Sequence, residues 1–229
     1  MDSEQHFQIE QMNLLKYLEE YYDFDGLIHA TPFANFLNIM DDGYVTGRKN
    51  NSHIISDIAN QEVINKTNNY VKKCARFYFY KNTPTYYHFN ESHPNDLIYL
   101  VFDWAIFSFN SAIIYDGNPA VPRTRCMSTR DYLLYNRDLI DWENVLSRAP
   151  FKLDEDCSDE EFEEKRECIR KRNAELDIDG NVSLDYLNKI ILKDENQVNV
   201  FYDFLDSNGI KPNIIKMISA KVIIDSSYF

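Results

Sequence analysis

The residues best suited to chemistry form a basic, aromatic run at positions 74–87, which reads Cys-Ala-Arg-Phe-Tyr-Phe-Tyr-Lys-Asn-Thr-Pro-Thr-Tyr-Tyr. The four rings at 77–80 favour a β-strand, and Pro84 ends it because proline cannot donate to a strand ladder. Arg76 and Lys81 flank the rings, so the run suits a ligand that carries both phosphate and an aromatic ring. Aromatic runs also pack protein cores, and the sequence leaves both interpretations open.

A second candidate site joins a short strand to a helix. Residues 27–29 form an apolar strand, and Thr31 followed by Pro32 predicts the start of a helix that runs to about residue 40. The first turn of a helix carries unpaired N–H groups and the positive end of the dipole, which favour an anion such as a pyrophosphate. His29 and Thr31 would lie beside it. A histidine at a strand end is also a common structural hydrogen-bonding residue.

These residues must be positioned by a mixture of helices and strands. Apolar side chains at helical spacing predict an amphipathic helix over residues 5–22, and Gly43 predicts the end of the helix that starts at Thr31. Ser158 and Glu161 have the spacing of a capping box, which predicts an acidic helix. The remaining predicted strands are 97–102, 113–115, 175–178, 190–192 and 220–224, and the remaining helices are 130–136, 195–205 and one from about 183. The elements alternate irregularly, which indicates an α+β fold in one domain.

Composition narrows the functional classes. The chain of 229 residues has a formal net charge of −13, which argues against a simple nucleic-acid binder. Residues 48–81 nevertheless hold seven basic and two acidic side chains, so that segment carries a charge of about +5. Most of the acid lies elsewhere, and residues 154–164 hold eight carboxylates that read as a solvated helix or an acidic binding face.

The cysteines and the N-terminus predict a soluble, cytoplasmic protein. The four cysteines are widely spaced, so neither a zinc cluster nor a disulfide framework is indicated. The first residues lack the features of a signal peptide, and no apolar run is long enough to span a membrane. Asp177 begins a calcium-loop-like sequence, but Val182 occupies the position that requires glycine, so we expect no metal.

Four motifs occur in one order along the chain. They are His29-x-Thr31-x-x-x-Asn35-x-x-x-Ile39-x-x-x-Gly43, Arg76-Phe77-Tyr78-Phe79-x-x-x-Thr83-Pro84-Thr85, Asp116-Gly117-Asn118 and Arg172-x-Ala174-Glu175. Together they resemble the DarT family of DNA ADP-ribosyltransferases over about residues 27–225. The resemblance implies an ADP-ribosyltransferase fold with a split, mixed β-sheet core flanked by helices. It assigns residues 27–229 to that domain and leaves residues 1–26 as an N-terminal helix packed on it.

The resemblance also implies an enzyme that uses NAD as co-substrate, transfers ADP-ribose to a base in single-stranded DNA and releases nicotinamide. Such enzymes are usually toxins of toxin–antitoxin or phage-defence systems, restrained by a macrodomain antitoxin. It assigns catalysis to Glu175, Arg76 and Lys66, the last because residues 63–68 lack the arginine that the family places upstream. The expected NAD contacts are His29, Thr31, Asn35, Arg48, Tyr78 and Tyr80, and the expected DNA contacts are Asn118, Arg123, Arg125, Arg130 and Arg172.

Carboxylate chemistry fits this assignment. Breaking the nicotinamide glycosidic bond creates positive charge on the ribose, which a nearby carboxylate such as Glu175 stabilises. Two alternatives remain from the sequence: a related transferase that modifies RNA, and a non-enzymatic acidic module that binds a partner. The sequence also leaves the acceptor base open between thymine and guanine.

Overall fold

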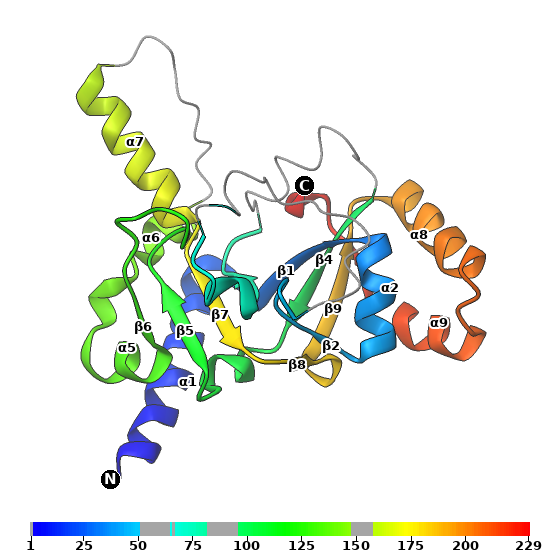
Figure 1. The fold of residues 1–229 in the computed structure, drawn as a ribbon, viewed down its shortest axis with the longest axis horizontal. Helices are drawn as coiled ribbons and strands as arrows, with labels where there is room; N and C mark the ends of the chain where they lie inside the picture. Colours follow the sequence, from blue (N-terminus) through cyan, green and yellow to red (C-terminus); the bar gives the residue numbers. More distant parts are fainter. Residues whose placement is uncertain (1, 51–64, 66, 82–95, 148–157) are drawn as a thin grey trace.

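A mixed β-sheet forms the centre of the molecule in the computed structural model, which describes residues 2–50, 65, 67–81, 96–147 and 158–229 (Figure 1). Within these residues the sheet has eight strands in the order β10-β9-β4-β1-β3-β7-β5-β6, and only β9 and β10 run parallel. The strands are β1 (Leu27–Pro32), β3 (Cys74–Tyr78), β4 (Leu97–Phe102), β5 (Ala112–Tyr115), β6 (Cys126–Ser128), β7 (Glu175–Asp179), β9 (Leu187–Leu192) and β10 (Val222–Ile224). Two short strands, β2 (Tyr44–Val45) and β8 (Val182–Ser183), pair separately.

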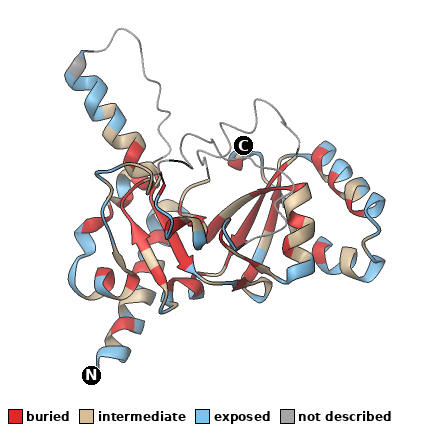
Figure 2. Cartoon of the chain, in the orientation of Figure 1, coloured by how far each residue is buried: buried red, intermediate tan, exposed pale blue. Residues whose placement is uncertain are grey.

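The helices gather at the two ends of the sheet. Those at one end are α2 (Phe33–Asp42), α8 (Glu195–Ser207) and α9 (Pro212–Ser219), and those at the other are α1 (Ser3–Tyr22), α5 (Thr129–Tyr135), α6 (Trp142–Val145) and α7 (Asp159–Arg172) (Figure 1). The predicted capping box of Ser158 and Glu161 is confirmed at the start of α7. From there α7 projects away from the body, and its outer half is exposed (Figure 2). None of the described helices combines the length and apolarity needed to cross a membrane.

Two predicted helix starts are wrong, and strand pairing explains both. Thr31 does not cap a helix, because β1 continues through Pro32 along β4, with Thr31 opposite Ile98, and α2 begins only at Phe33. The helix expected from residue 183 is instead β8, which pairs with β2, followed by a 3₁₀ turn. Gly43 ends α2 with a φ of 77°, as predicted, and α9 was not predicted at all.

The two faces of the sheet are packed differently. One face carries the main core, in which Phe77, Leu100 and Leu176 are buried under the helices. The other carries a smaller cluster around Ile28 and Tyr99. Strands are the most completely buried elements (Figure 2). The aromatic run of β3 serves both faces, since successive side chains of a strand alternate: its even-numbered residues share the second face with the odd-numbered residues of β7.

Candidate active site

A buried ion pair joins the two central strands β3 and β7. Tyr78 lies opposite Glu175 and Arg76 lies opposite Asp177 in the ladder. Arg76 donates from Nε to Oε2 and from Nη2 to Oε1 of Glu175, each at 2.7 Å, which is the fork geometry of a strong, charge-assisted pair. The Glu175 side chain is 0% exposed, whereas that of Arg76 is 31% exposed. The arginine therefore has access to solvent and the glutamate has none.

Asp177 is a second buried carboxylate beside the same arginine. It is 0% exposed, and neither of its oxygens has a hydrogen-bond partner. Its Oδ1 lies 3.8 Å from Nε of Arg76. Burial, reinforced by the charge of Glu175, raises the pKa of Asp177 well above its usual range, and Arg76 only partly opposes this. Burial raises the pKa of Glu175 as well, and the charge and hydrogen bonds of Arg76 oppose this rise. Two carboxylates that share one cation in a dry site hold one proton between them, and we place it on Asp177 because Glu175 has both bonds to Arg76.

His29 occupies the point where the sheet splits. In the described chain β1 pairs with β4 along its whole length, from Leu27 to Pro32, but it pairs with β3 only at Ile28 and Tyr78. His29 Nδ1 lies 3.0 Å from the carbonyl oxygen of Arg76. Because a carbonyl only accepts, Nδ1 carries the proton, and burial lowers the pKa of His29, so the ring is neutral. Its Nε2 is then an acceptor, suited to a ligand hydroxyl group.

The other residues expected to contact NAD surround this split. Thr31 is buried in β1, Asn35 is half-buried on the first turns of α2, and Tyr78 is half-buried on the face of β3 that carries Arg76. The contacts of these side chains with NAD stay a prediction.

Three further predicted residues lie around the ends of β3. Arg48 is half-buried, and its neighbour Lys49 donates its backbone N–H to the carbonyl of Lys72, just before β3 begins. At the other end, the guanidinium of Arg172 lies 5.7 Å from the centre of the Tyr80 ring and donates to the carbonyl of Ser147 at 2.8 Å. Lys66 lies outside the described residues, as do Thr83, Pro84 and Thr85 of the second motif.

A cleft of about 320 Å³ opens beside Ile28 at the end of β3. Its walls include Tyr80, Lys81, Tyr228, Asp25 and Asp225. Lys81 and the two aspartates give this cleft charges of both signs.

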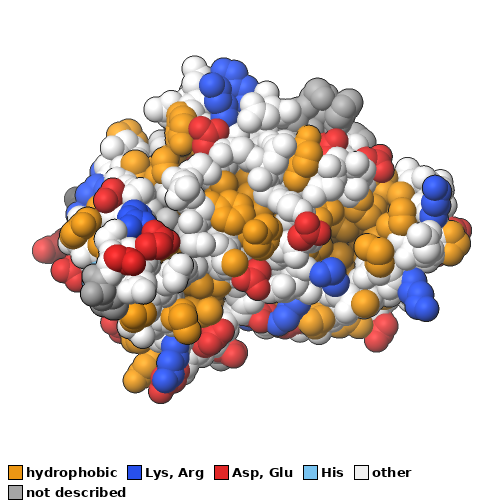
Figure 3. All heavy atoms as spheres, turned by 90° about the horizontal axis from the view of Figure 1, so that it is seen from below, with side chains coloured by type: hydrophobic (Ala, Val, Ile, Leu, Met, Phe, Trp, Pro, Cys, Tyr) orange, Lys and Arg blue, Asp and Glu red, His pale blue; other side chains and the backbone are white. Residues whose placement is uncertain are grey.

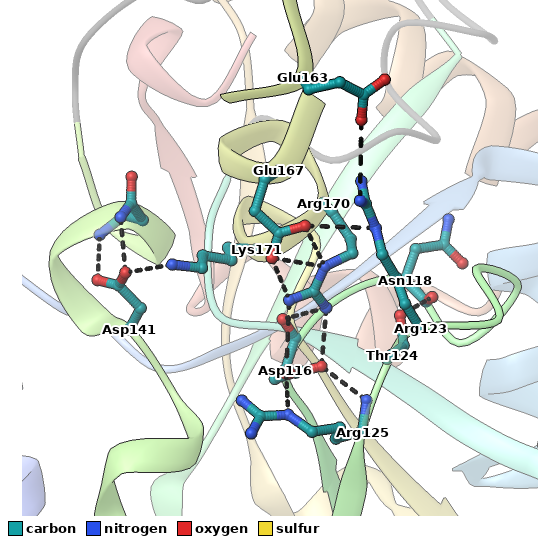
Figure 4. A network of polar contacts seen from close by, with 11 residues as sticks. Asp116, Asn118, Arg123, Thr124, Arg125, Asp141, Glu163, Glu167, Arg170 and Lys171 are labelled. Atoms are coloured by element: carbon teal, nitrogen blue, oxygen red, sulfur yellow. Dashed lines mark hydrogen bonds and ion pairs between the residues drawn. The ribbon is translucent and has the colours of Figure 1, made fainter. Parts of the chain in front are cut away.

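Three of the residues expected to contact DNA, Asn118, Arg123 and Arg125, lie in a polar network between β5, β6 and α7 (Figure 4). Arg125 donates to Asp116 through its backbone N–H and its Nε, at 2.8 and 2.9 Å. The Nε of Arg123 lies 3.3 Å from Glu167. The side-chain oxygen of Asn118 accepts the backbone N–H of Ala120, which fixes the turn after β5.

Arg130 lies apart from this network. It donates to Glu4 and to Ser3, both at 2.7 Å, and its guanidinium lies over the ring of Phe7. Arg130 therefore fastens α1 to α5. A role for any of these residues in DNA binding stays a prediction, as does a domain boundary at residue 26.

The face seen in Figure 3 has no broad basic patch that could bind DNA, because its Lys and Arg side chains are scattered among acidic ones. No group of His, Cys, Asp and Glu within the described part of the chain is arranged to hold a metal. Cys74, Cys126 and Cys168 are free thiols.

Sequence reasoning missed two residues of these clusters. Asp177 was assigned only to a calcium-like loop, although its place two residues after Glu175 in a predicted strand puts both carboxylates on one face. Arg170 stood in a basic run with nothing to mark it. Its guanidinium lies between Asp116, at 2.8 Å, and Glu167, at 2.7 Å.

Comparison with known proteins gives a family match and several similar solved structures. A family model described as "ssDNA thymidine ADP-ribosyltransferase, DarT" matches residues 28–222. The fold is similar to that of Thermus sp. 2.9 DarT in complex with ADP-ribosylated ssDNA, with a TM-score of 0.66 and 15% identity over 89% of this chain and 95% of that one. The NAD⁺ complex of the same protein gives a TM-score of 0.64 and 14% identity over 89% and 96%.

A third similar structure is Thermosipho africanus DarTG in complex with ADP-ribose, with a TM-score of 0.66 and 18% identity over 90% of this chain and 51% of that one. No curated protein matches the chain significantly in sequence. These likenesses confirm the predicted fold, a split mixed sheet flanked by helices.

Proposed function

The chain belongs to the DarT family of ssDNA thymidine ADP-ribosyltransferases, and from this membership we propose that it transfers ADP-ribose from NAD to thymine in single-stranded DNA and releases nicotinamide. The observation that carries the proposal is the extent of the family match, which spans residues 28–222 and so includes the split at His29 and the pair of Arg76 and Glu175. The relatives solved with NAD⁺ and with ADP-ribosylated ssDNA support the same reaction.

The residues at the split fit the two substrates. The neutral His29 offers Nε2 to a ribose hydroxyl, and Tyr78, on the face of Glu175, offers a ring for nicotinamide to stack on. Glu175 stabilises the positive charge that develops on the ribose as the bond to nicotinamide breaks. A ring nitrogen of thymine then bonds to the same ribose carbon and loses its proton to Glu175.

A mass measurement tests the proposal. The purified protein is incubated with NAD and single-stranded oligonucleotides that contain or lack thymine, in DNA and in RNA form, and the intact masses are read for an added ADP-ribose. We expect an adduct on thymine-containing DNA. Glu175→Gln should lower its rate by about 10²–10⁴-fold, because a general base and charge-stabilising group is lost. Glu195→Gln, an exposed position on α8, is the matched control and should leave the rate unchanged.

The other outcomes separate the alternatives. An adduct on RNA alone would replace DNA with RNA as the substrate. Adduct formation on neither, or an equal rate for Glu175→Gln, would contradict the proposed enzyme and favour a binding module.

We extend the proposal to the biological setting. Modification of DNA bases makes this chain a toxin of the cytoplasm, held in check by a macrodomain antitoxin that removes the mark. Expression in a bacterial host should therefore stop growth, whereas expression of Glu175→Gln should not. Equal growth of the two strains would contradict the toxin role and leave the enzymatic assay unaffected.

A further inference from the structure

The strongest unexplained feature of the active site is the buried carboxylate of Asp177, neither oxygen of which has a hydrogen-bond partner. We propose that Asp177 is a positioning residue that receives the guanidinium of Arg76 when NAD engages Glu175, and that NAD binding therefore releases a proton from Asp177. The inference rests on the proposed function, since it concerns how NAD reaches the catalytic carboxylate.

Glu175 cannot meet a substrate in the arrangement observed. Its side chain has no exposed surface, and both of its oxygens accept from Arg76. Contact with a ribose hydroxyl or an acceptor base requires a covering group to move. Arg76 is that group, because it lies over both oxygens and is itself partly exposed.

Asp177 is placed to take the arginine. Its Oδ1 is already 3.8 Å from Nε of Arg76, and it stands directly opposite Arg76 in the β3–β7 ladder. Neither oxygen of Asp177 is committed to another donor. A rotation of the arginine side chain exchanges one buried carboxylate for the other, without any change in the sheet.

The charges of the groups in the site explain why NAD binding releases a proton. With Arg76 on Glu175, the cluster holds one cation, one anion and a protonated Asp177, so its net charge is zero. NAD brings a positive nicotinamide ring next to Glu175. If Arg76 then pairs with Asp177, two cations face two carboxylates, and the site is neutral again only when Asp177 has lost its proton to solvent. Neutrality is strongly favoured in a site that excludes water.

Other groups face Asp177, and they do not release protons near neutral pH. Besides Arg76 and Glu175, they are Cys74 on β3, Tyr115 on β5 and Cys126 on β6. Burial raises the pKa of Cys74 to about 12 and also raises those of Tyr115 and Cys126. His29 is neutral before NAD arrives, since burial lowers its pKa. Burial raises the pKa of Glu175 too, but both of its oxygens accept hydrogen bonds from Arg76, which favour its ionised form. A proton released on binding therefore comes from Asp177.

Calorimetry measures the proton directly. Carba-NAD⁺, the analogue bound in another structure of Thermus sp. 2.9 DarT, serves as the probe. It is titrated at pH 6.5 into the wild-type protein in two buffers of different ionisation enthalpy. The difference in binding enthalpy should correspond to release of roughly one proton per bound ligand, and the affinity should rise about tenfold per pH unit until Asp177 is ionised without ligand.

Two variants complete the test. Asp177→Asn replaces a protonated acid by a neutral group of the same size, so the resting cluster keeps its charge. It should release no proton and should bind carba-NAD⁺ roughly tenfold more weakly at pH 8, because the displaced Arg76 finds no anion. Asp179→Asn, two residues further along β7 and exposed, is the matched control and should behave as wild type. Thermal unfolding of both variants checks that they are folded.

The outcomes distinguish this inference from the proposed function. Binding of carba-NAD⁺ without proton release, or equal release by Asp177→Asn and wild type, would overturn the exchange of Arg76 and leave NAD as the substrate. Failure of the wild type to bind carba-NAD⁺ would overturn both.

Discussion

Two buried clusters of arginine and carboxylate lie in this molecule, and they are built in opposite ways. In the cluster between β5, β6 and α7, Arg170 donates to both oxygens and to the carbonyl of Asp116, and Arg125 adds two further hydrogen bonds (Figure 4). In the cluster of β3 and β7, Arg76 holds Glu175, while Asp177 has no hydrogen bond. In the first cluster the buried carboxylate has two arginine partners, whereas in the second cluster two buried carboxylates share one arginine.

The pKa values show the same contrast. Hydrogen bonds from Arg170 and Arg125 outweigh burial and lower the pKa of Asp116, whereas burial outweighs Arg76 and raises that of Asp177. A carboxylate whose oxygens accept several hydrogen bonds is stabilised in its ionised form and holds the neighbouring backbone in place. A buried carboxylate without hydrogen bonds keeps its proton and remains available to a second cation. The paired cluster is therefore structural, and the unpaired one is where we expect chemistry.

The Asp116 cluster also determines where Glu175, the expected catalytic residue, lies. Arg170 lies in the last turn of α7, and the chain passes through Asn173 and Ala174 directly into Glu175 at the start of β7. The bonds from Arg170 to Asp116 tie this end of α7 to the turn after β5. That tie fixes the entry of β7, and with it the register of Glu175 opposite Tyr78.

Removing the central arginine of the paired cluster should have the largest effect. Arg170→Met leaves the buried Asp116 without its main partner and should lower the free energy of unfolding by about 3–5 kcal/mol, as is typical when one member of a buried pair is lost. Urea unfolding measures this loss. Arg166→Met, an exposed position one turn earlier on α7, is the control and should change it by less than about 0.5 kcal/mol. Equal losses would mean that the Asp116 cluster is not structural.

The same substitution should have opposite signs in the two clusters. At pH 7 Asp116→Asn should lower the free energy of unfolding by about 1.5–3 kcal/mol, because charge-assisted hydrogen bonds are weakened. Asp177→Asn should raise the free energy of unfolding, because keeping the buried wild-type acid protonated at pH 7 costs free energy and asparagine avoids this cost. Unfolding of both variants in urea gives the comparison.

The pH dependence of stability follows from the directions of the two pKa shifts. The pKa of Asp116 is lower in the folded chain than in the unfolded chain, where it is about 4. Asp116 therefore stabilises the fold above about pH 4, and this stabilisation is lost as the pH falls from about 4 through the lowered pKa. The pKa of Asp177 is higher in the folded chain than in the unfolded chain. Asp177 therefore contributes its full stabilisation below about pH 4, and this contribution is lost as the pH rises from about 4 through the raised pKa. The advantage of Asp177→Asn over wild type should therefore grow from pH 4 upward. If Asp177→Asn destabilises the protein at pH 7, the carboxylate is ionised and our contrast is wrong.

Sequence patterns predicted most of the fold because local signals and the sheet agree there. The apolar run at 97–102 became the fully buried strand β4, and the capping box at Ser158 started α7. The prediction failed where pairing with a distant strand overrides a local signal. Thr31 and Pro32 have the pattern of a helix start, yet β4, about 65 residues later, draws them into the sheet.

The site was predicted only as far as its motifs extend. Glu175, Arg76 and His29 come together at the split, and their catalytic and binding roles remain predictions. The charge state of the site depends on Asp177, which no motif marks and which only the β3–β7 register brings opposite Arg76. Similarly, the partner of Asp116 is Arg170, 54 residues away, and one among several basic residues in its run.

The smallest expected effect separates the two arginines that hold Asp116. The Arg125 side chain is 68% exposed, and its backbone N–H, which also bonds Asp116, survives any substitution. Arg125→Ala should therefore lower the free energy of unfolding by less than about 1 kcal/mol.

Because Arg125 is exposed and contributes little to the fold, its side chain is available to contact DNA. If it does, Arg125→Ala should raise the KM for the oligonucleotide and reduce its salt dependence, with carba-NAD⁺ binding unchanged. An unchanged KM would leave Arg125 as a minor brace of the structural cluster, and the predicted DNA contact would have to come from elsewhere on the surface.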